Sequence, residues 1–153
     1  QILIAEDDLD DQLLLKSAFK DNKIDCQVTF VSDGEQLLTY LKDSIATSTP
    51  PHLILLDLNM PKIDGREVLQ QIRNDASLSH IPVLIISTSS AEGEIKTAYS
   101  LGASAYLVKP ASYEKLLLLV KNLSAFYFET VALRWAETII IEIATKRSLL
   151  SWE

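Results

Sequence analysis

Five short apolar runs, separated by stretches of helical periodicity, constrain the fold of this chain more than any other feature. They occupy residues 2–5, 28–31, 53–56, 83–86 and 105–108. Strands lose their polar alternation when both faces are buried, which is typical of a parallel sheet covered by helices on both sides. The sequence therefore predicts an α/β domain with five parallel strands.

The connections between these runs restrict how the sheet can be wound. Crossovers between parallel strands are right-handed, and a doubly wound sheet with strand order 2-1-3-4-5 fits the pattern best. Helical spacing of apolar residues predicts an inward face for each intervening helix. The first such face is Leu9, Leu13, Leu14 and Ala18, and the fourth is Ile95, Ala98, Tyr99 and Leu101.

Composition limits the domain count and the partners. A chain of 153 residues with 48% apolar content supports one core and is too short for two comfortable domains. Its 14 basic and 21 acidic residues give a net charge of −7, which disfavours nucleic acid and anionic membrane surfaces as partners. Cys26 has no internal disulfide partner, and no apolar stretch is long enough to cross a bilayer; both favour a cytoplasmic protein.

Charged side chains gather where the predicted strands end. Glu6, Asp7 and Asp8 follow the first run, Asp57 follows the third, and Lys109 follows the fifth. Ligands of doubly wound sheets bind beyond the carboxyl ends of the strands, so these side chains are expected to meet there. Like charges in a crevice repel, and Mg²⁺ with oxygen ligands offsets that repulsion, aided by the Lys109 ammonium.

Such a site is suited to phosphoryl transfer. A carboxylate can attack phosphorus when a metal and an ammonium offset the charge on the phosphoryl oxygens, and the Ser87 hydroxyl can donate to one of them. Charge alone does not select the nucleophile among the carboxylates.

Residues 2–110 resemble the receiver domain of bacterial response regulators, which has a flavodoxin-like fold. The resemblance rests on five fragments in order. They are the acidic doublet after the first strand, Leu-Leu-Asp57-Leu-Asn-Met-Pro61, Asp64-Gly65, Ile-Ser87-Thr, and Gly102-Ala-Ser-Ala-Tyr106-Leu-Val-Lys109-Pro110.

The resemblance implies a role for each residue that matches the family's site. Asp57 is the expected phosphoacceptor, and Ser87 and Lys109 are expected to bind the phosphoryl group. Tyr106 matches the aromatic switch position, which moves inward together with the hydroxyl residue. Because Thr88 is also hydroxylic, the choice between Ser87 and Thr88 stays open at this point.

The resemblance also implies the metal ligands. Glu6 and Asp7 form the acidic pair, Asp7 and Asp57 bind Mg²⁺ through their side chains, and Asn59 adds its backbone carbonyl. The adjacent Asp8 leaves open which carboxylates face the metal. Similar domains have a cis peptide bond before the proline that follows the lysine, here Pro110.

The C-terminal region continues beyond the usual end of such a domain. We expect the receiver domain at 1–128 and an extension at 129–153, which forms a longer last helix or a tail. Residues 123–133 resemble the end of small stand-alone receivers associated with phytochromes, which implies a homodimer. The last helix has more apolar residues than one buried face needs, so either a partner covers them or the monomer tolerates their exposure.

The sequence therefore predicts a single-domain response regulator of a two-component phosphorelay, and not an enzyme acting on a separate substrate. Its donor is a histidine kinase or phosphotransfer protein, and it signals to a downstream protein through the fourth and fifth helices and the fifth strand. A Mg²⁺-dependent phosphatase with an aspartyl intermediate is one alternative, although Asn59 stands where that class has a second acid. A receiver-like adaptor without phosphorylation is another, although Asp57 and Lys109 are both present.

Overall fold

The computed structural model describes residues 1–130 and shows one five-stranded sheet. The strands lie in the order β2-β1-β3-β4-β5, and every neighbouring pair is parallel, which confirms the predicted winding. Their bounds are β1 (Ile2–Ala5), β2 (Val28–Val31), β3 (Leu53–Leu56), β4 (Val83–Ser87) and β5 (Ala105–Val108).

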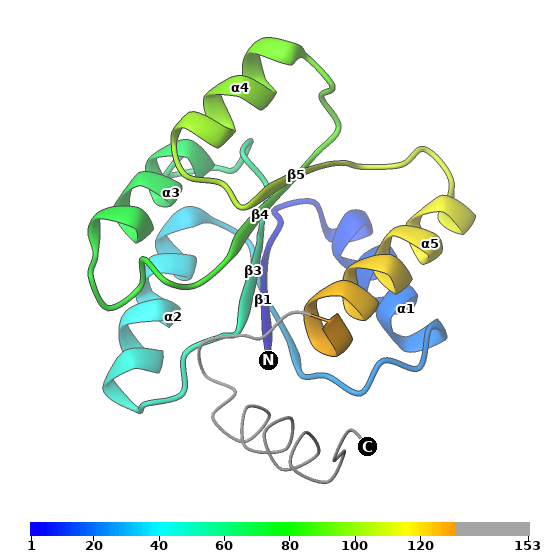
Figure 1. Ribbon diagram of the computed structural model, residues 1–153, viewed down its shortest axis with the longest axis horizontal. Coiled ribbons are helices and arrows are strands. Elements are labelled where there is room, and N and C mark those ends of the chain that lie inside the picture. Colours follow the sequence, from blue (N-terminus) through cyan, green and yellow to red (C-terminus); the bar gives the residue numbers. More distant parts are fainter. Residues whose placement is uncertain (131–153) are drawn as a thin grey trace, which may run out of the picture.

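Helices cover both faces of this sheet. α2, α3 and α4 lie on one face, and α1 and α5 pack together on the other (Figure 1). The helices are α1 (Leu9–Asp21), α2 (Gly34–Ala46), α3 (Gly65–Asn74), α4 (Glu92–Ser100), α5 (Tyr113–Ser124) and a terminal π-helical turn η1 (Ala125–Thr130). None of the helices within residues 1–130 is long and apolar enough to cross a membrane.

Two apolar cores form because successive strand residues point to opposite faces. In β1, Leu3 and Ala5 join the core beneath α2, α3 and α4, whereas Ile2 and Ile4 join the core beneath α1 and α5. All four are fully buried, so the absence of polar alternation in β1 follows from helix cover on both sides.

The predicted inward face of α1 is confirmed at Ala18 and wrong at its three leucines. Leu9, Leu13 and Leu14 are exposed, and the helix packs instead through Leu15, Ala18 and Phe19. Helical spacing fits either set, since Leu13, Leu14 and Leu15 are consecutive. Contact with α5 buries the face formed by Leu15, Ala18 and Phe19, and Leu9, Leu13 and Leu14 are left on the surface.

Tyr99 of α4 was also expected to face inward, and it is exposed. Its hydroxyl oxygen accepts a hydrogen bond from the backbone N–H of Tyr106, at 3.2 Å. β5 is an edge strand, so this N–H has no neighbouring strand on its outer side. The tyrosine therefore partners the sheet edge instead of entering the core.

Candidate functional site

Backbone hydrogen bonds that extend the parallel ladders position the polar residues following the strands. The Glu6 N–H donates to the Val31 carbonyl at 3.0 Å, and the Asp57 N–H donates to the Ala5 carbonyl at 3.0 Å. The Lys109 N–H donates to the Ser87 carbonyl at 2.7 Å. Each side chain therefore leaves the sheet from a fixed point on the same rim.

No cis peptide bond occurs in residues 1–130, so the expected cis bond at Lys109–Pro110 is wrong for this structure.

Three carboxylates converge on this rim. Glu6, Asp7 and Asp57 each offer an oxygen atom within 4.8 Å of the other two. Glu6 and Asp57 are buried and Asp7 is exposed. A cluster of carboxylate oxygens with one side open to water fits a Mg²⁺ ion that retains part of its hydration. Asp8 lies outside this group, because its carboxylate accepts from the backbone N–H groups of Asp10 and Asp11 and caps α1.

The Lys109 ammonium lies among carboxylates. Its Nζ atom is 2.5 Å from Glu6 Oε2, 2.8 Å from Asp11 Oδ2 and 2.9 Å from Asp57 Oδ2. The lysine thus joins the ends of β1, β3 and β5 to the first turn of α1. Charge-assisted hydrogen bonds of this kind are stronger than neutral ones.

Burial and hydrogen bonding shift the pKa values of Glu6 and Lys109. Burial raises the pKa of Glu6 to about 7, against the opposing effect of its hydrogen bond with Lys109. Burial alone would lower the pKa of Lys109, but hydrogen bonds to Asp11, Glu6 and Asp57 outweigh burial and raise it. The ammonium is therefore charged at neutral pH, while the proton occupancy of Glu6 changes in that range.

The loop after β3 holds the Asp57 carboxylate. The backbone N–H of Asn59 donates to Asp57 Oδ1 at 2.9 Å, and Asn59 itself is exposed. The N–H of Gly65, at the start of α3, donates to the Leu58 carbonyl at 3.0 Å. A Cβ atom at Gly65 would collide with the backbone of Asp57 and Leu58, so glycine permits α3 to begin directly against this loop.

The two candidate hydroxyl residues differ in burial. Ser87 is the last residue of β4 and is buried, whereas the next residue, Thr88, is exposed. The Ser87 hydroxyl oxygen accepts from the Ser89 N–H at 3.2 Å. Tyr106 is partly buried, and its hydroxyl donates to the Ser89 carbonyl at 3.0 Å. The segment that follows β4 therefore connects the Ser87 hydroxyl to the Tyr106 side chain.

Asp11 is the residue at this site that the sequence reasoning missed. It comes from a helix and not from a strand end, so the rule about strand ends did not select it. A usable signal was its place in the first turn of α1, directly after the end of β1, because helical side chains tilt toward the helix N-terminus and here toward the same rim.

The fold and this arrangement define a doubly wound α/β domain with a carboxylate cluster and a lysine at the carboxyl ends of its strands, and comparison with known proteins gives its family. Residues 2–121 match the model of the response regulator receiver domain, and the chain belongs to that family. It is 37% identical over 134 residues to response regulator Rcp1 of Synechocystis sp., covering 86% of this chain and 91% of Rcp1.

Solved structures give the same result. The phosphorylated cyanobacterial phytochrome response regulator RcpA superposes with a TM-score of 0.80 at 38% identity, covering 87% of this chain and 96% of RcpA. The Mn²⁺-bound form of Rcp1 has a TM-score of 0.77 at 36% identity, covering 86% of this chain and 96% of that chain. This chain is therefore a receiver domain of two-component signalling, similar to regulators that include phytochrome-associated ones.

Proposed function

We propose that this protein is a single-domain response regulator that accepts a phosphoryl group on Asp57 from a histidine kinase or phosphotransfer protein in the cytoplasm. The arrangement of Lys109 carries the proposal: its ammonium contacts the buried Asp57 carboxylate directly, at 2.9 Å. A carboxylate beside a fixed cation is suited to attack an anionic phosphodonor. The likeness to response regulator Rcp1, of which this chain covers 91%, supports a regulator of the same kind.

The transfer uses groups already on the rim. A carboxylate oxygen of Asp57 attacks phosphorus, an acyl phosphate bond forms, and the P–N bond to the donor imidazole breaks. The imidazole nitrogen keeps the bonding electron pair. Lys109 and the Ser87 hydroxyl donate to phosphoryl oxygens and stabilise their negative charge in the transition state.

The carboxylate cluster fits a resident Mg²⁺. Asp7 and Asp57 would bind it through their side chains, Asn59 through its backbone carbonyl, and Glu6 would complete the acidic pair. When bound, the ion offsets the charge on the phosphoryl oxygens. Rcp1 has been solved with Mn²⁺ bound, which supports a divalent site in this family.

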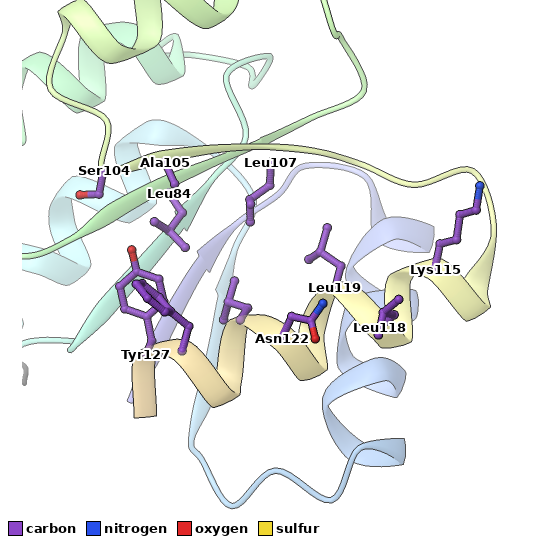
Figure 2. A pocket seen from close by; sticks show the side chains of 11 residues that line it. Leu84, Ser104, Ala105, Leu107, Lys115, Leu118, Leu119, Asn122 and Tyr127 are labelled. Atoms are coloured by element: carbon purple, nitrogen blue, oxygen red, sulfur yellow. The ribbon is translucent and has the colours of Figure 1, made fainter. Parts of the chain in front are cut away.

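The signalling surface is proposed to be the face formed by α4, β5 and α5. Between β5 and α5 lies an apolar groove of about 690 Å³ (Figure 2). Its lining includes Leu107, Leu118, Leu119, Leu123, Phe126 and Tyr127. Leu118 and Phe126 are exposed, so this face suits a second copy of the chain, and phosphorylation is proposed to alter it through Ser87 and Tyr106.

A labelling experiment tests the proposal. The wild-type protein, incubated with Mg²⁺ and acetyl phosphate or a phosphorylated phytochrome-type kinase, is expected to acquire an acid-stable, hydroxylamine-labile phosphoryl group. Asp57→Asn abolishes the label. Asp64→Asn is the matched control, because the Asp64 side chain caps α3 and contacts Arg66, and asparagine also caps well. Equal labelling of Asp57→Asn and wild type, or steady turnover of small phosphate esters, would overturn the assignment.

A further inference from the structure

The hydrogen-bonding capacity of Lys109 is fully used in this structure. An ammonium group has three N–H donors. Three carboxylates each take one: Glu6 at 2.5 Å, Asp11 at 2.8 Å and Asp57 at 2.9 Å. Lys109 can therefore donate to a phosphoryl oxygen only if it releases one of these partners.

The three partners differ in what their release costs. The side chain of Glu6 is 1% exposed and that of Asp57 is 9% exposed, whereas that of Asp11 is 36% exposed. A buried carboxylate that loses its cation stays desolvated, which is strongly unfavourable. An exposed carboxylate is rehydrated instead. Asp11 is therefore the partner that Lys109 gives up at the lowest cost.

We propose that Asp11 is a positioning residue that holds Lys109 in the unphosphorylated protein and is exchanged for a phosphoryl oxygen when Asp57 is modified. The inference rests on the proposed phosphorylation of Asp57. It assigns to the first turn of α1 a direct part in setting the phosphorylation rate, because the Asp11–Lys109 ion pair must open before the transition state forms.

The exchange predicts that loss of Asp11 affects formation of the acyl phosphate and its hydrolysis differently. Formation of the acyl phosphate begins with Lys109 bound to Asp11, so loss of Asp11 lowers the barrier. Hydrolysis begins with Lys109 already on the phosphoryl group, so loss of Asp11 leaves that barrier unchanged. A mere disturbance of α1 would not separate the two rates in this way.

Asp10 supplies a matched control. It is exposed in the same first turn of α1, carries the same charge, and its side chain makes no contact with Lys109. The acetyl phosphate reaction is followed in Mg²⁺ for wild type, Asp11→Asn and Asp10→Asn, and the loss of label is followed after the donor is removed. Asp11→Asn is expected to form the acyl phosphate roughly twofold to fivefold faster than Asp10→Asn, the range of one partly exposed ion pair. Both variants are expected to lose the label at the wild-type rate.

A second measurement follows the ion pair itself. Asp11→Asn is expected to lower the melting temperature below that of Asp10→Asn in the unmodified protein, and to match it in the beryllofluoride adduct, where Lys109 contacts the phosphoryl mimic. Equal formation rates for the two variants, or an equal melting deficit with and without beryllofluoride, would overturn the role of Asp11. If either result is found and wild type still acquires the label, only the role of Asp11 fails. If wild type acquires no label on Asp57, the proposed function fails as well.

Discussion

Two regions of the molecule differ in whether their side chains have partners. One is the charged rim at the carboxyl ends of β1, β3 and β5, and the other is the apolar groove between β5 and α5. On the rim, Lys109 is bonded to three carboxylates, so its charge is held in place. In the groove, Leu118 and Phe126 remain in contact with water. The rim therefore holds its charges against one another, whereas the groove leaves apolar side chains uncovered.

One strand belongs to both regions. Leu107 of β5 lines the groove, Tyr106 beside it donates to the Ser89 carbonyl, and Lys109 follows the strand end. β5 lies at the sheet edge, with a strand on one side only. A shift at the rim can thus reach the groove over a few residues, and the predictions below separate the two regions and then test that link.

The largest expected effect is on the rim. Lys109→Met removes the only cation seen to contact Asp57 within residues 1–130, and it is expected to slow acyl phosphate formation about 100-fold. Leu118→Asn, in the groove, is expected to leave the rate within about twofold of wild type. Stopped-flow or radiolabel kinetics with acetyl phosphate measures both. Comparable losses in the two variants would contradict the separation of the regions.

The rim is also expected to give a pH dependence that the groove lacks. Burial raises the pKa of Glu6 from its ordinary 4.5 to about 7, so between these values the folded state binds more protons than the unfolded chain. The free energy of unfolding therefore decreases as pH rises through this window. Glu6→Gln is expected to flatten the profile by about 2 kcal/mol. Urea denaturation in EDTA from pH 5 to 8 measures the difference between variant and wild type; parallel profiles would contradict it.

Metal affinity sharpens the description of the rim. Asp7→Asn removes a carboxylate from the cluster and is expected to raise the Mg²⁺ dissociation constant about tenfold or more. Asp8→Asn is expected to leave it unchanged, because Asp8 caps α1 and asparagine preserves the cap. Titration calorimetry compares the two. A larger loss of Mg²⁺ affinity in Asp8→Asn than in Asp7→Asn would assign the metal to the Asp8 carboxylate instead.

Self-association tests the groove. Leu118→Glu places a charge on an apolar surface and is expected to weaken a dimer about tenfold. Leu13→Glu on α1 is the control, since Leu13 is 63% exposed and Leu118 is 56% exposed. Sedimentation of phosphorylated and unphosphorylated protein measures both. Equal weakening by the two substitutions would show that exposed leucines in general, and not this groove, drive association.

The sequence predicted the sheet more fully than the helix faces. Strand order followed from five apolar runs and a crossover rule, and the clustering of Glu6, Asp57 and Lys109 followed from strand ends. The α1 face did not follow, because three consecutive leucines fit either side of the helix, and only contact with α5 selects Leu15. Asp11 was missed for a related reason: its place over the rim depends on the exact start of α1. The expected boundary at 128 is untested, and most of the expected extension, residues 131–153, lies outside the described part of the chain.

The smallest expected effect tests the link through β5. Tyr106→Phe removes the hydroxyl that donates to the Ser89 carbonyl, which is expected to cost about 1 kcal/mol of stability. This bond fixes the ring in its observed position against the core, so its loss is expected to let the ring reorient. Self-association of unphosphorylated protein should then change by roughly twofold to fivefold, with the phosphorylation rate of Asp57 unchanged.

Tyr113→Phe is the control for this substitution, because its hydroxyl bonds Asp21 and joins α5 to α1 away from Ser89. It is expected to cost a similar amount of stability without changing self-association. If Tyr106→Phe altered only stability, as the control does, the ring would be a packing residue and the rim and groove would need another connection. If it altered the phosphorylation rate as strongly as self-association, the two regions would not be separable at Tyr106, because the ring would then act on the reacting carboxylate as well as on the groove.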